Sequence, residues 1–123
     1  KILGDRLFLI SDALFASSPG QPGPRAEFSL GEFVVHYESD PNGPGRYVNN
    51  EGKLAGSALT LIDCVRVCVE KVGLSLAQAL RMATQIPAEI IRMGDQLGTI
   101  RPGYVANLVR LDKALMVKEV WTA

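Results

Sequence analysis

Hydrophobic positions follow more than one pattern along the chain, and the first pattern is an unbroken run. Leu7 to Ile10 are all apolar, with no polar residue between them, and the run stops at Ser11 and Asp12. A short continuous apolar run is typical of a strand buried on both faces of a parallel sheet. We therefore expect residues 6–11 to form such a strand, with a carboxylate at its end.

The middle of the chain instead alternates short apolar segments with turn-forming residues. The segments predict strands at residues 28–30, 33–37 and 46–48, joined by turns in "DPNGPG" and "NNEG". Before them, "PGQPGP" at residues 19–24 predicts a surface loop. His36, the only histidine, falls in the second strand. A metal site needs several converging ligands, so a lone histidine here is more often a structural or surface residue.

Helical spacing begins after Gly56. Apolar residues then recur three and four positions apart: Leu61, Ile62, Val65, Cys68, Val69 and Val72. Ser57 is the predicted N-cap of this helix, and Gly73 is its predicted stop. Cys64 and Cys68 lie on one face of the helix, where packing as small apolar residues is the favoured role and a metal or redox pair is the alternative.

The last part of the chain predicts two more helices followed by strands. Ser75 to Gln78 form a capping box that opens a helix through about Thr84. Pro87 and Gly94 then mark the start and stop of a short third helix. Pro102-Gly103 fits the centre of a type II turn, and strands are expected at 106–111 and 117–122. Taken alone, this order of elements is α+β.

Composition limits the classes of protein that need to be considered. The chain has 123 residues, 47% hydrophobic and 21% charged, with a formal net charge of zero, so nothing in its charge favours nucleic acid or a membrane surface. No apolar run approaches the roughly 20 residues of a membrane span, and the start lacks a signal-peptide pattern. A cytoplasmic location is therefore expected. Because the chain begins Lys-Ile-Leu and enters an apolar run almost at once, we expect it to be part of a longer protein.

The order of motifs resembles one enzyme family over nearly the whole chain. "LISDA", "NNEGKLAGSALTLIDCV", "LSLAQALRMATQIPAEIIRM" and "LGTIRPGYVANLVRLD" are similar to the C-terminal third of the N-acetylglucosamine-6-phosphate deacetylase family of amidohydrolases, and "GKLAGSALTL" is the most specific of them. The resemblance implies an α/β fold in which residues 1–95 form the C-terminal part of a metal-dependent hydrolase (β/α)₈ barrel with a hairpin flap. Residues 96–123 would supply closing strands of a small β-sandwich.

The resemblance also assigns roles to residues of this chain. It implies that Asp12 is the general base and acid, which takes a proton from a metal-activated water and delivers it to the departing sugar amine. It implies that Leu54, Ala55 and Gly56 form a substrate-contacting turn, although Ala55 replaces a common Ser and leaves only a backbone contact there. The alternatives are a turn-capping aspartate and a plain turn before a helix.

The implied cofactor is a divalent metal, zinc or iron, bound by a Glu and two His on earlier strands. A chain whose only histidine is His36 cannot carry that set, so we predict no metal ligand here and no activity for the chain alone. The implied partners are a sugar-phosphate substrate and further copies of the protein in a homo-oligomer.

Two other functions stay open from the sequence. One is another amidohydrolase that acts on a cyclic amide or a nucleobase, and the other is a non-catalytic assembly or interaction domain. The loop after Asp12 and the turn in "ESDPNGPG" are longer than is typical of the family, which leaves room for a changed substrate preference.

Overall fold

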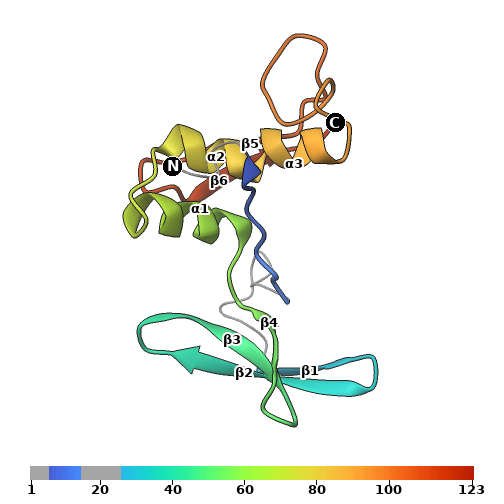
Figure 1. Cartoon of the computed structure of the whole chain (residues 1–123), viewed down its shortest axis with the longest axis vertical. Coiled ribbons are helices and arrows are strands. Elements are labelled where there is room, and N and C mark those ends of the chain that lie inside the picture. The colour runs from blue at the N-terminus through green and yellow to red at the C-terminus, as the bar shows by residue number, and fades with distance from the viewer. Residues whose placement is uncertain (1–5, 15–25) are drawn as a thin grey trace. The chain divides into compact units, whose positions relative to one another are not determined.

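The computed structural model describes residues 6–14 and 26–123, and Figure 1 shows its elements. In chain order they are β1 (Glu27–Leu30), β2 (Phe33–Asp40), β3 (Gly43–Asn49), β4 (Leu54–Ser57), α1 (Leu61–Glu70), α2 (Leu76–Ala83), α3 (Gln85–Ile90), β5 (Leu108–Leu111) and β6 (Val117–Trp121). They divide into two compact units. We call Ser11–Leu61 the sheet unit, and Lys1–Ile10 with Ile62–Ala123 the helical unit. The loop predicted at residues 19–24 lies outside the described residues.

The sheet unit is an antiparallel meander in the order β1-β2-β3-β4 (Figure 1). Its core contains the buried side chains of Val35, Tyr47 and Val48, and the ring of Phe28 packs edge-on against that of Tyr47 at a centroid distance of 5.3 Å. The three predicted strands and their turns are confirmed. The strands are longer than predicted because the turn after β2 takes only two residues.

β4 corrects the prediction for the end of this unit. Residues 54–56 were expected to form a turn with Ser57 as the helix N-cap, but Leu54–Ser57 is a strand and α1 begins only at Leu61. Ser57 pairs with Arg46 of β3, so its backbone belongs to a sheet and not to a helix end. Tertiary pairing outweighs the local capping signal here.

The helical unit confirms most of the predicted helix boundaries. Ser75 and Gln78 make the capping box of α2, and Gly73 has a φ of +77° after the end of α1. α3 starts two residues before Pro87, which therefore lies inside its first turn. The buried core consists of Val65, Ala79, Ile86 and Ala88. None of the helices in residues 6–14 and 26–123 is long and apolar enough to cross a membrane.

The strand predicted at residues 6–11 is not formed. Leu7, Phe8 and Ile10 are 44%, 45% and 72% exposed, and the Leu9 N–H donates to the carbonyl oxygen of Met82 at 2.9 Å. A buried parallel strand needs neighbouring strands on both sides, and the isolated parallel bridge nearby, Ala13 to Ser57, lies beyond the end of residues 6–11. The predicted strand is therefore wrong for the described residues, because an apolar run forms a buried strand only where neighbouring strands pair with it.

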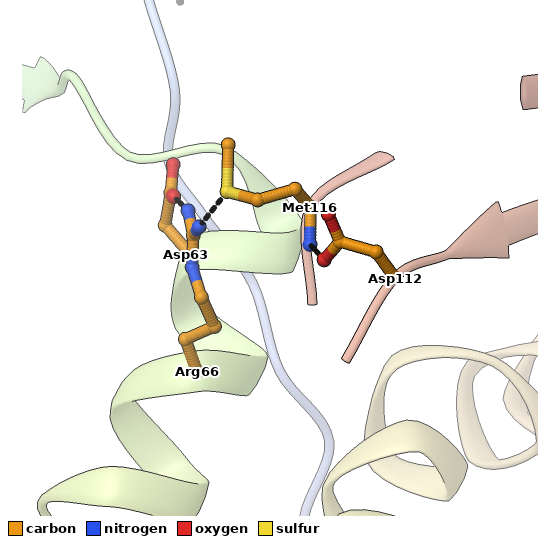
Figure 2. A network of polar contacts seen from close by, with 4 residues as sticks. All are labelled: Asp63, Arg66, Asp112 and Met116. Carbon is orange, nitrogen blue, oxygen red and sulfur yellow. Dashed lines mark hydrogen bonds and ion pairs between the residues drawn. The ribbon is translucent and has the colours of Figure 1, made fainter. Parts of the chain in front are cut away.

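β5 and β6 form a two-stranded antiparallel ribbon whose turn contacts α1. Figure 2 shows Arg66 of α1 bonded to the carboxylate of Asp63 and to the sulfur of Met116. The carboxylate of Asp112 accepts the N–H of Met116 at 2.9 Å, which fixes the same turn. The ribbon confirms the two predicted strands. The type II turn before them is also confirmed, because Gly103 has a positive φ and the N–H of Tyr104 donates to the carbonyl oxygen of Arg101.

Candidate functional site

The segment from Ser11 to Leu14 lies against strand β4, so two parts of the predicted site meet within the sheet unit. The N–H of Ser57 donates to the carbonyl oxygen of Asp12 at 2.8 Å, and the N–H of Leu14 donates to the carbonyl oxygen of Ser57 at 3.0 Å. These bonds form a parallel bridge between Ala13 and Ser57. The candidate catalytic residue is thereby held beside Gly56 and Ser57, at the end of β4.

Asp12 has an uncommon backbone conformation. Its φ is +50°, in the left-handed region that costs most residues roughly 1–2 kcal/mol and that aspartate tolerates better than bulkier residues. Strained conformations of this kind persist where surrounding bonds hold them, and they cluster at functional sites. Asp12 is also exposed, so its carboxylate is accessible to a ligand from solvent.

Gly56 is required by a close approach of the chain to itself. A Cβ at this position would lie 2.6 Å from Cγ of Leu14 and 2.9 Å from the carbonyl oxygen of Asp12. Gly56 is buried, and the space beside it is taken by the Asp12 segment. Of the predicted contact residues, Leu54 is exposed and Ala55 is half-buried, so these two are the ones open to a substrate.

The sequence predicts Ser57 to be a helix N-cap, but in the structure it is a strand residue that bonds to the Asp12 segment. Its hydroxyl donates to the carbonyl oxygen of Ser11 at 2.5 Å and accepts the N–H of Leu59 at 3.1 Å. A serine before a helical pattern is the usual N-cap signal, and for this reason the sequence predicts a cap here. No local signal distinguishes that role from a strand residue bonded to a segment 46 positions away.

The single histidine and the two cysteines, which are the other candidates from the sequence, make structural contacts. Nδ1 of His36 pairs with Glu27 across β1 and β2 at 3.0 Å. Cys64 and Cys68 are free and half-buried, and burial, with Cys68 nearby, raises the pKa of the Cys64 thiol. Across residues 6–14 and 26–123, no three His, Cys, Asp or Glu side chains come together as a metal site. The described residues therefore do not fit the metal that the family implies.

The chain belongs to the amidohydrolase family, whose sequence model matches residues 4–122. The resemblance seen in the motifs is thereby confirmed, and the family is one of generally metal-dependent hydrolases.

The similar proteins within the family are named as deacetylases of amino-sugar 6-phosphates. The chain is 34% identical over 117 residues to the N-acetylgalactosamine-6-phosphate deacetylase of Escherichia coli O157:H7, covering 95% of this chain and 29% of the relative. It is 31% identical over 108 residues to the N-acetylglucosamine-6-phosphate deacetylase of Haemophilus influenzae, covering 88% of this chain and 26% of the relative. The crystal structure of the N-acetylglucosamine-6-phosphate deacetylase from Pasteurella multocida matches with a TM-score of 0.82 at 28% identity, over 97% of this chain and 29% of that one.

The chain is shorter than these relatives. It spans 65%, 29% and 26% of the first three curated relatives that it matches, which is less than two thirds of each.

Proposed function

We propose that these residues are the part of a metal-dependent deacetylase that supplies the proton-transferring carboxylate and one edge of the substrate site. The observation that supports this most directly is the bridge between Ala13 and Ser57, which holds Asp12 against β4, the strand that contains Leu54–Gly56, in a chain of the amidohydrolase family. Two sequence motifs more than 40 residues apart are brought to one place, as a shared site requires.

The chemistry asked of Asp12 is proton transfer. Hydrolysis of an N-acetyl group adds water across the amide, so a proton leaves the attacking water and a proton must reach the departing nitrogen. One carboxylate can do both in turn if it lies within about 2.6–3.2 Å of the water and then of the nitrogen. Asp12 takes the first proton as base and gives it to the amine as the C–N bond breaks, releasing acetate and the amino sugar.

The proposed substrate is N-acetylglucosamine 6-phosphate, converted to glucosamine 6-phosphate and acetate. Relatives named for N-acetylgalactosamine 6-phosphate match at least as well, and the two sugars differ only in the configuration at C4. Both substrates therefore belong in the test. The required divalent metal, zinc or iron in this proposal, would be bound outside the described residues.

The fold assignment follows from the same resemblance. We assign residues 1–95 to the end of a (β/α)₈ barrel with the meander β1–β4 as a flap, and residues 96–123 to a small β-sandwich. The antiparallel ribbon β5–β6 supports the second assignment, because antiparallel pairs are the units from which sandwiches are built.

The test is turnover of both sugar phosphates by the metal-loaded full-length protein that contains these residues. We expect deacetylation that Asp12→Asn slows by about 10²- to 10⁴-fold, and slower or no hydrolysis of a hydantoin-type cyclic amide. The 123-residue chain with the same metal is the control and should release no acetate. Undiminished deacetylation by Asp12→Asn would exclude the role of Asp12, and faster turnover of the cyclic amide would favour another amidohydrolase.

A further inference from the structure

Ser57 makes hydrogen bonds to the backbone on both sides of Asp12. Its side-chain hydroxyl donates to the carbonyl oxygen of Ser11 at 2.5 Å, and its backbone N–H donates to the carbonyl oxygen of Asp12 at 2.8 Å. We propose that Ser57 is a positioning residue, which sets the orientation of the Asp12 carboxylate for proton transfer. This inference rests on the proposed role of Asp12.

The two bonds fix the two peptide planes that flank Asp12. The carbonyl of Ser11 belongs to the peptide plane before Asp12, whose rotation relative to the Cα is φ. The carbonyl of Asp12 belongs to the peptide plane after it, whose rotation is ψ. One residue on β4 therefore restrains both backbone dihedrals of Asp12, including its positive φ of +50°.

The direction of the side chain follows from those dihedrals. If φ relaxed to the negative values that most residues adopt, the bond from Cα to Cβ would turn relative to β4 and move the carboxylate. A misplacement of about 1 Å can lower the rate of a catalysed step by roughly 10²-fold. Ser57 reaches Asp12 only through the backbone, so it should affect the rate of proton transfer more than the binding of substrate.

The Ser57 hydroxyl is well suited to this function because it is itself held in place. It accepts the N–H of Leu59 at 3.1 Å while it donates to Ser11, so one bond orients the oxygen that makes the other. Ser57→Ala removes only these side-chain bonds and leaves the backbone pair with Asp12. Ser57→Thr retains a hydroxyl and Ser57→Val has the same shape as Thr without it, which gives a matched pair suited to a strand.

The experiment compares kcat and KM of these variants in the metal-loaded full-length protein, using N-acetylglucosamine 6-phosphate and N-acetylgalactosamine 6-phosphate. We expect Ser57→Ala and Ser57→Val to lower kcat by about 10- to 100-fold with KM changed less than about 3-fold, and Ser57→Thr to restore most of kcat. Equal rates for Thr and Val, or a loss confined to KM, would overturn the proposal.

A double substitution separates this inference from the proposed function. If Ser57 acts through Asp12, Ser57→Val should lower the residual rate of Asp12→Asn no further, whereas independent roles would give additive losses. An active Asp12→Asn protein would refute the role of Asp12 itself. An inactive Asp12→Asn protein beside a fully active Ser57→Val protein would refute only the positioning role of Ser57.

Discussion

Ser57 and Asp12, 45 positions apart in the sequence, are joined by a backbone hydrogen bond of 2.8 Å from the Ser57 N–H to the Asp12 carbonyl oxygen. The contact leaves no space for a side chain at the preceding residue, Gly56. The short segment Leu54–Ser57 thus has two functions in the sheet unit. It pairs with β3 on one edge and holds the Asp12 segment on the other.

Asp12→Asn should remove activity while leaving the fold unchanged. Asparagine retains the shape of aspartate and tolerates a positive φ, but it cannot accept and return a proton. We expect kcat of the metal-loaded full-length protein to fall by about 10²- to 10⁴-fold, with a thermal midpoint close to that of the wild type. Asp95→Asn, at another exposed aspartate, is the matched control and should change neither quantity.

Gly56→Ala should destabilise the sheet unit through a steric clash. The new Cβ would lie 2.6 Å from Leu14 and 2.9 Å from the Asp12 carbonyl oxygen, and the latter is a backbone atom that cannot rotate away. Overpacking of this kind costs typically about 1–3 kcal/mol, which should appear as a lower denaturant midpoint by circular dichroism. Ala55→Ser at the half-buried neighbouring position should have little effect, and an equally stable Gly56→Ala protein would contradict the observed approach.

The predictions from sequence succeeded where structure depends on neighbouring residues. The capping box at Ser75 and the turn at Pro102-Gly103 both follow from the chemistry of residues within four positions of one another, as does the presence of a turn in "DPNGPG", although not its two-residue length. Such signals are complete in the sequence itself, because both partners of each bond lie in the same short segment.

The predictions failed where structure depends on distant partners. Ser57 carried a capping signal but is a strand residue, because β3 and the Asp12 segment bond to it from elsewhere in the chain. Leu7 to Ile10 had the pattern of a buried strand but have no ladder of neighbours in the described part. Motif resemblance predicts Asp12 and Leu54–Gly56 as site residues, and this stays a prediction. The bonds that join the Asp12 segment to Ser57 could not be predicted from either segment alone.

Ser75→Ala should weaken α2 by removing its N-cap. The Ser75 hydroxyl accepts the N–H of Gln78 at 3.3 Å, and the Gln78 side chain accepts the N–H of Ser75 at 3.2 Å. Loss of such a cap costs about 1 kcal/mol, which chemical denaturation followed by the fluorescence of Trp121, the only tryptophan, should detect. Ser75→Thr retains an acceptor oxygen and should retain most of the stability. An unchanged unfolding free energy in Ser75→Ala would show that the capping box contributes nothing measurable.

Asp112→Asn should make the stability of the helical unit less dependent on acid pH. The pKa of the Asp112 carboxyl is held below its ordinary value of 3.8, first by the N–H bond from Met116 and then by the hydrogen bond from Lys118. A lowered pKa in the folded state means that the ionised carboxylate stabilises the fold above pH 3.8, and that this contribution is lost as the pH falls through the lower folded-state value. The wild type should therefore have the higher thermal midpoint at neutral pH, and its advantage over Asp112→Asn should shrink as the pH falls below 3.8. Asparagine can still accept the bonds from Ala114 and Met116, so the substitution removes only the charge and the pairing with Lys118 at 3.1 Å. Lys118→Gln removes the contributions of Lys118, its hydrogen bond and its charge, and leaves the larger contribution of the Met116 N–H, so most of the pH dependence should remain. A difference between wild type and Asp112→Asn that stays constant as the pH falls below 3.8 would contradict the assigned shift.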